Sequence, residues 1–153
     1  MDNGKSVVEF VEEYRGLKYV SKFQSLGFRC GYVVIPDDIL DRVKADAEPD
    51  YECIPINTHG GITFFGVIFI NKDGLDCEWV IGFDCGHYLD ARDKEYWKKY
   101  FPEEYAKFEK YLDHPYRTPL DTVKTQEFVR EECLKMIDQI IDIYYNDVTN
   151  CED

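Results

Sequence analysis

The sequence predicts an α+β fold: a mainly antiparallel sheet with a central hairpin, packed by a long C-terminal helix and by shorter helices. Residues 62–70 and 75–83 form two dense apolar, aromatic and β-branched runs, separated by Asn71-Lys72-Asp73-Gly74. Asp-Gly favours a hairpin turn because glycine accepts a positive φ. Both runs are apolar on both faces, which indicates an internal pair of strands. Residues 122–145 carry an apolar stripe at helical spacing.

The C-terminal helix is the strongest single prediction. Its apolar positions recur every three or four residues: Val129, Cys133, Met136, Ile137, Ile140, Ile141 and Tyr144. A stripe of this kind packs against a core, so we assign this helix packing and no chemistry.

Other segments complete the prediction. In chain order they are a strand or short helix at 6–13, strands at 18–23 and 28–35, a helix from Asp37 up to Pro49, an extended piece at 51–56, and two short helices within 91–112. Pro102 divides the last pair, because proline interrupts a helix. The length of 153 residues favours a single domain over residues 1–153, with residues 1–6 and 147–153 frayed.

Charge and hydropathy exclude two classes of partner. The formal net charge is −13, and a protein that binds duplex nucleic acid needs a positive surface to release counterions. We read the charge mainly as a source of solubility. A small phosphorylated ligand remains compatible, because one or two arginines can act locally. No run approaches the ~18 apolar residues of a membrane span.

Cysteine usage indicates a reducing compartment. The six cysteines stand at positions 30, 53, 77, 85, 133 and 151. Nothing at the N-terminus resembles a signal peptide, since Glu9 interrupts the apolar stretch from Val7 to Val11. We therefore expect free thiols in the cytoplasm. There is no C-x-x-C pair, which weakens zinc-ribbon and redox interpretations.

The predicted hairpin gathers polar residues at the end away from its turn. Its register places Gly61 opposite Asp84 and Thr63 opposite Gly82, since antiparallel partners lie at equal distances from the turn. The polar or reactive side chains expected in this region are His59, Thr63, Asp84, Cys85 and His87. Four glycines accompany them at positions 60, 61, 82 and 86. They provide either room for a ligand beside the backbone or plain loop geometry.

A binding pocket is the first of several interpretations of this cluster. His59, Thr63 and Asp84 would supply hydrogen bonds, and Tyr32 or Phe83 would stack on an aromatic ligand. Arg29 or Arg92 would meet an anionic group, although each is also a candidate for an internal salt bridge. Backbone groups of Gly60 and Gly61, with Cys85, His87 and Asp90 close by, would complete the ligand-binding set. No cofactor is expected.

Three alternatives remain open. Cys85 could act as a nucleophile with a histidine as its base, which would make the chain a small hydrolase. His59, Asp84, Cys85 and His87 are also metal-ligand types, so a metal hydrolase is a second alternative, although the spacing lacks a matching second pair. Finally, the cluster could be structural, with Asp90 orienting His87 or the turn after it.

Five ordered blocks resemble a widespread family of small phage and prophage proteins. The blocks are EYRGL at 13–17, RCGYV at 29–33 with Pro36, HGGIT at 59–63, WVIGFDCGH at 79–87 with Asp90, and TQEFVREEC at 125–133. The likeness covers residues 13–137. Two departures are Gly86, where alanine is common in the family, and Leu89, where glycine is common. The segment 37–56 also differs in length and composition.

The resemblance implies a phage origin and action in the cytoplasm of an infected bacterium. Small phage proteins often counter host defence, and some sequester nucleotide immune signals in pockets, commonly as homo-oligomers. This analogy favours a non-catalytic protein that captures a small nucleotide-like ligand. The partners considered are that ligand, a second copy of the chain, and a host defence protein that the acidic surface would inhibit.

Overall fold

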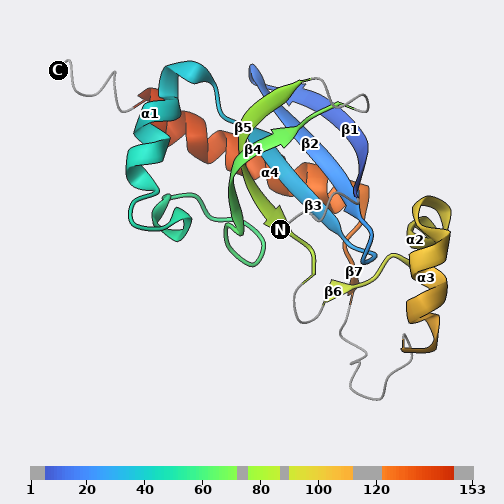
Figure 1. Ribbon diagram of the computed structural model, residues 1–153. Helices are drawn as coiled ribbons and strands as arrows, with labels where there is room; N and C mark the ends of the chain where they lie inside the picture. Colours follow the sequence, from blue (N-terminus) through green and yellow to red (C-terminus); the bar gives the residue numbers. More distant parts are fainter. Residues whose placement is uncertain (1–5, 72–75, 87–89, 112–121, 147–153) are drawn as a thin grey trace.

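The computed structural model describes residues 6–71, 76–86, 90–111 and 122–146. It confirms an α+β fold with an antiparallel five-stranded sheet in the order β1-β2-β3-β5-β4 (Figure 1). The strands are β1 (Ser6–Tyr14), β2 (Leu17–Gln24), β3 (Arg29–Val34), β4 (Phe64–Phe69) and β5 (Cys77–Asp84). Two further strands, β6 (Asp90–Ala91) and β7 (Thr122–Val123), form a separate parallel pair.

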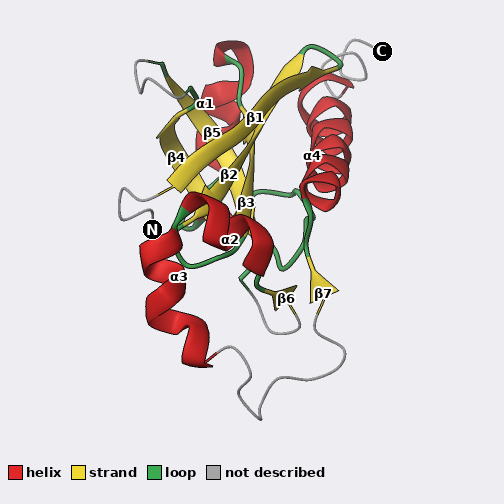
Figure 2. Ribbon diagram, turned by 90° about the vertical axis from the view of Figure 1, so that its right-hand side faces the viewer, coloured by secondary structure: helices red, strands yellow, loops and turns green. Residues whose placement is uncertain are grey.

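The helices lie at the two ends of the sheet and along one face. They are α1 (Asp37–Asp46), α2 (Lys94–Tyr100), α3 (Pro102–Phe108) and α4 (Gln126–Ile140), which continues as a π-helical segment over Ile141–Tyr145. Figure 2 shows α4 on one side of the sheet and α2 and α3 below it. Pro102 separates α2 from α3, as the sequence predicted.

The first hairpin is closed by a turn of only two residues. Tyr14 of β1 pairs with Leu17 of β2, and between them Arg15 and Gly16 have φ values of 52° and 87°. Positive φ at both central positions matches the turn that best follows the twist of two antiparallel strands. This turn fixes residues 6–14 as a strand, where the sequence had left strand and short helix open.

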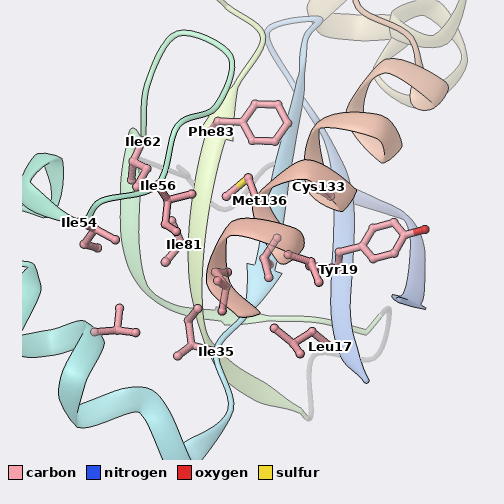
Figure 3. Close-up of a cluster of buried hydrophobic side chains, with 14 of the residues drawn as sticks. Leu17, Tyr19, Ile35, Ile54, Ile56, Ile62, Ile81, Phe83, Cys133 and Met136 are labelled. Atoms are coloured by element: carbon pink, nitrogen blue, oxygen red, sulfur yellow. The ribbon is translucent and has the colours of Figure 1, made fainter. Parts of the chain in front are cut away.

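The long C-terminal helix covers the main core. Thr125 caps α4 by accepting a hydrogen bond from the Phe128 N–H at 3.2 Å. The predicted stripe is buried, with Val129, Cys133, Met136, Ile137 and Ile140 each fully enclosed. It packs on residues from β2, β3, β5 and the loop before β4 (Figure 3). Burying one such side chain contributes roughly 1.5–3 kcal/mol.

The opposite face of the sheet carries a second apolar cluster. Its buried members are Val20, Cys30, Tyr32, Val34, Ile70 and Val80, with Val8, Phe28, Phe64 and Ile68 packed against them. All of these residues come from strands or from positions next to strands. This face is not the one that α4 covers. A groove lined mainly by strand residues lies on it.

Two local predictions need correction. Of the two strands of the predicted hairpin, β5 is internal but β4 is an edge strand, so the hairpin lies at one end of the sheet and not at its centre. Residues 51–53 form a 3₁₀ turn where an extended piece was expected. Asp50 favours that turn because its side chain accepts a hydrogen bond from the Glu52 N–H at 2.9 Å. Outside the described residues lie most of the predicted hairpin turn and nearly all of both predicted frayed ends. The exception at the ends is Ser6, which belongs to β1.

Candidate functional site

A groove of about 430 Å³ lies on the sheet face opposite α4. Its lining residues are Lys22, Gln24, Phe28, Cys30, Tyr32, Thr63, Phe64, Val67, Ile68, Phe69, Phe83 and Asp84. Four of them, Tyr32, Thr63, Phe83 and Asp84, belong to the ligand-binding set predicted from the sequence. The ring of Phe83, however, packs over Gly31 in the main core on the α4 side, so the expectation that it stacks on a ligand is corrected. The groove mixes aromatic and polar side chains, the combination typical of small-molecule sites.

Strand register creates the floor of this groove in two adjacent rows. Lys22 of β2 pairs with Cys30 of β3, and Cys30 in turn pairs with Asp84 of β5. In the next row on the same face, Tyr32 pairs with Gly82, which also pairs with Phe64 of β4. Because alternate residues on a strand share a face, both rows point the same way. A cation, a thiol and a carboxylate thus stand beside a row of aromatic rings.

Tyr32 organises the aromatic part of the groove. Its ring lies against Gly82, where an added Cβ would stand 2.5 Å from the ring. The ring of Phe64 meets that of Tyr32 edge to face at a centroid distance of 5.9 Å. The ammonium of Lys22 lies 6.0 Å from the Tyr32 ring centroid, at the outer limit for a cation–π contact. Gly82 therefore serves the packing of Tyr32.

Lys22 is the lining residue with the most unusual environment. Only 6% of its surface is exposed, although lysine is almost never fully buried in proteins without a compensating contact. Gln24, at 9% exposure, precedes the turn on the same face of β2. These two residues bring a cation and an amide to the groove.

Asp84 and Thr63 border the groove at the open end of the hairpin. The Thr63 N–H donates a hydrogen bond to the Gly82 carbonyl at 2.9 Å, so the two strand ends are neighbours as predicted. The register differs from the prediction by one residue, because Phe64 and not Thr63 pairs with Gly82. Asp84 accepts a hydrogen bond from the Gly86 N–H at 2.9 Å. Arg92 lies next to this region, with its guanidinium carbon 5.4 Å from the ring centroid of the lining residue Phe28.

His59 belongs to a different group of contacts. Its Nε2 lies 2.9 and 3.0 Å from the two carboxylate oxygens of Asp90, and its ring meets that of Phe128 edge to face at 5.0 Å. The His59 N–H donates to the Glu132 carboxylate at 3.0 Å. Asp90, with a side chain only 1% exposed, also lies 3.1 Å from the ammonium of Lys124. These contacts fasten the loop before β4 to β6 and α4.

Arg29 is enclosed in an ion-pair network and does not line the groove. Its guanidinium donates to Glu9 at 2.8 and 3.2 Å and to Asp93 at 2.7 Å. The rings of Phe23 and Tyr96 flank it at 5.1 and 4.8 Å. Arg29 is 1% exposed, so the expectation that it meets a ligand phosphate is corrected. Burial lowers the pKa of Arg29, but its hydrogen bonds to the carboxylates of Glu9 and Asp93 outweigh burial and raise that pKa.

Cys85 has the environment of an inert buried thiol. It is 1% exposed and packs in the main core with Phe83. Burial raises the pKa of the Cys85 thiol, and the nearby carboxylate of Asp90 raises it further. Because the thiolate is the nucleophilic form, this environment disfavours the nucleophile role considered for Cys85.

The remaining predicted residues divide between two regions. Gly60 and Gly61, with φ values of 68° and 86°, line a separate hollow of about 790 Å³ formed by the loop from Glu52 to Ile62. They do not line the groove beside Asp84. His87 lies outside the described residues. Within the described ranges, no group of three His, Cys, Asp or Glu side chains could hold a metal ion.

The sequence pattern did not identify eight of the groove residues, which are Lys22, Gln24, Phe28, Cys30, Phe64, Val67, Ile68 and Phe69. A signal was present, because alternation along β2 places Val20, Lys22 and Gln24 on one face. The turn at 25–27 then brings Lys22 opposite Cys30. What could not be read from the pattern was which face of β2 would lie against α4.

Comparisons with known proteins add no functional information. No family model, no curated protein and no solved structure matches this chain. Among the helices described, none combines the length and apolar character needed to cross a membrane.

Proposed function

We propose that this chain is a non-catalytic binding protein that holds a small nucleotide-like ligand in the groove between β2, β3, β5 and β4. The observation that carries the proposal is a lysine at 6% exposure beside the ring of Tyr32, in a groove of about 430 Å³. A lysine ammonium binds phosphate oxygens as a point charge. Aromatic rings beside it offer stacking surfaces for a base.

The polar residues of the groove suit recognition of a nucleoside. Gln24, Thr63 and Asp84 together offer donors and acceptors along the groove. Phe28 and Phe64, which pack against the same apolar cluster as Tyr32, add ring surface. Lys22 takes the phosphate-binding role first considered for Arg29. Arg92, beside Phe28, is the second cation near this site.

The proposal includes a biological setting that rests on the resemblance to phage proteins. In that setting the chain acts in the cytoplasm of an infected bacterium and captures a nucleotide signal of host defence. Capture without turnover agrees with the burial of Cys85, whose thiol lies in the core. A sponge of this kind needs affinity and no general base.

The first experiment tests binding and turnover together. Isothermal titration calorimetry is run with AMP, ADP, cyclic di-AMP, cyclic di-GMP and cyclic ADP-ribose. The expected result is a saturable heat with at least one of them. The complex is then heat-denatured, and liquid chromatography with mass spectrometry is expected to recover the nucleotide intact. Recovery of a cleaved nucleotide would replace the sponge with a hydrolase.

The second experiment tests the groove. Lys22→Met keeps most of the apolar stem and removes the charge, so binding is expected to weaken by roughly tenfold or more. Lys18→Met is the matched control, because Lys18 lies on the same strand and is exposed. Equal affinity of the Lys22→Met variant and the unmodified chain would rule out the groove as the binding site.

A further inference from the structure

The edge strand β4 lacks the features that normally protect a sheet edge. Its sequence, FFGVIF, contains no charge and no proline, and Val67 and Phe69 are 48% and 52% exposed. In the described part of the chain, β5 is the strand that pairs with β4. An uncharged, apolar edge offers unpaired backbone groups to another strand.

The other edge of the same sheet is protected in the usual way. Strand β1 carries Glu12 and Glu13 and has a bulge between Val8 and Phe10. Acidic side chains and bulges both discourage pairing with a foreign strand. The contrast between the two edges singles out β4 as the one open to a partner.

A pocket of about 480 Å³ lies beside β4, on the face from which Phe65 projects. Tyr51, Phe65 and Trp79 are its aromatic lining residues, and the rings of Phe65 and Trp79 stand 5.2 Å apart. Glu48 and Asp50 also line it. Alternation along the strand places Phe65 and Val67 on one face, and Val67 pairs with Trp79.

This pocket already holds a cation from the chain itself. The ammonium of Lys44, on α1, lies 4.4 Å from the Trp79 ring centroid. Tryptophan is the best of the aromatic side chains at attracting a cation through its face. The Lys44 contact shows that an alkyl ammonium fits against Trp79 in this position.

We propose that β4 and this pocket bind an extended basic segment of a partner protein. The segment adds as a strand to the free edge of β4, and its backbone supplies the pairing. One of its lysine or arginine side chains enters the pocket and takes the place of Lys44 against Trp79. Glu48 and Asp50 complement the positive charge of that side chain.

Charge decides between a basic partner and a second copy of the chain. Each copy carries a net charge of −13, so pairing two copies at this edge sets two acidic bodies against each other. A basic segment is attracted by the same field and by the two carboxylates of the pocket. The pocket beside Trp79 shares no lining residue with the groove, although Val67 and Phe69 of β4 also line the groove. The proposal of a basic partner does not depend on the proposed function.

The test uses a defined probe, an acetylated and amidated peptide of about seven alternating valine and arginine residues, long enough to span β4. Binding is followed by tryptophan fluorescence and by hydrogen exchange of the backbone amides. The chain has two tryptophans, and Trp97 is 2% exposed, so Trp79 is expected to report the binding. We expect slower exchange of the β4 amides and no binding of a matched valine–glutamate peptide.

Matched variants locate the site. Val67→Lys introduces charge on the β4 edge and is expected to weaken peptide binding by roughly tenfold or more. Val11→Lys is the control at the opposite edge, where valine is similarly exposed, at 41%, and should change nothing. Phe69→Lys repeats the test if the first variant folds poorly. Glu48→Gln should also weaken binding.

Three outcomes would overturn the proposal. One is peptide binding that survives both Val67→Lys and Phe69→Lys. Another is equal binding of the valine–glutamate peptide, which would show that charge plays no part. The third is a dimer in sedimentation analysis that Val67→Lys dissociates, because the edge would then be occupied by a second copy.

Discussion

The ring of Tyr32 lies over Gly82, its direct partner across the β3–β5 pair. The neighbouring pair reverses the arrangement on the opposite face, where the ring of Phe83 lies over Gly31. A Cβ built at either glycine would stand 2.5 Å from the facing ring. The two glycines thus let one aromatic ring sit close to the backbone on each side of the sheet.

This relationship predicts the effect of adding a methyl group at Gly82. Gly82→Ala is expected to lower the free energy of unfolding by about 1–3 kcal/mol, because the new Cβ overlaps the Tyr32 ring. Chemical denaturation monitored by circular dichroism measures the change. Gly66→Ala on β4 is the control, since its Cβ would meet the Phe64 ring at a milder 3.1 Å. Equal stability of the two variants would contradict the packing role of Gly82.

The buried ion pair of Arg29 with Glu9 predicts a large loss of stability when one partner is removed. Arg29→Met leaves the Glu9 carboxylate, whose side chain is fully buried, without its main cation. The expected cost is about 3–5 kcal/mol in the free energy of unfolding. Adding Glu9→Gln to Arg29→Met should recover part of that loss. If Arg29→Met leaves stability unchanged, the network does not hold β1, β3 and α2 together.

The contact of His59 with Asp90 predicts local loosening when the carboxylate is removed. Asp90→Ala deprives both His59 and Lys124 of a buried partner, and we expect a loss of about 1–3 kcal/mol. Hydrogen exchange should rise at the His59 N–H, which α4 holds through Glu132. Asp76→Ala is the control, because Asp76 is an exposed residue outside this network. Unchanged exchange at His59 would show that Asp90 does not fasten this loop.

Burial predicts which cysteines react with alkylating reagents. Cys53 and Cys77 are exposed, whereas Cys30, Cys85 and Cys133 are buried. In the folded protein, iodoacetamide should modify the first two and spare the other three, as read by peptide mass spectrometry. Rapid modification of Cys85 in the native state would instead support a nucleophilic role for its thiol.

The same burial predicts a loss of stability in alkaline solution. Burial raises the pKa of the thiols of Cys85 and Cys133 above the ordinary value of 9.0. Above that pH the unfolded chain releases these protons while the folded chain keeps them, so the free energy of unfolding falls as pH rises. Below that ordinary pKa both states keep these protons, so the contribution of the two thiols to the free energy of unfolding does not change with pH. Thermal melts of Cys133→Ala should show a shallower alkaline decline than those of Cys53→Ser.

The sequence predicted the β4–β5 hairpin to within one residue of its register but assigned several residues to the wrong surroundings. The hydrophobic period and the Asp-Gly turn are local signals, and they brought Thr63 next to Gly82. Arg29 lies on β3 one position from Cys30, which lines the groove, yet strand alternation turns Arg29 to the opposite face. A single step in the sequence thus separates a groove residue from a buried ion-pair network.

By itself the sequence determined the α+β class, the hairpin, the two helices divided by Pro102 and the buried stripe of α4. Each of these features depends on short-range periodicity or on the backbone preference of one residue. Only the tertiary structure decided that β4 is an edge, that His59 meets Asp90, and that Lys22 stands in the groove. Those outcomes depend on strand order and on which face α4 covers. Both are set by contacts between residues far apart in the chain, and local pattern does not encode them.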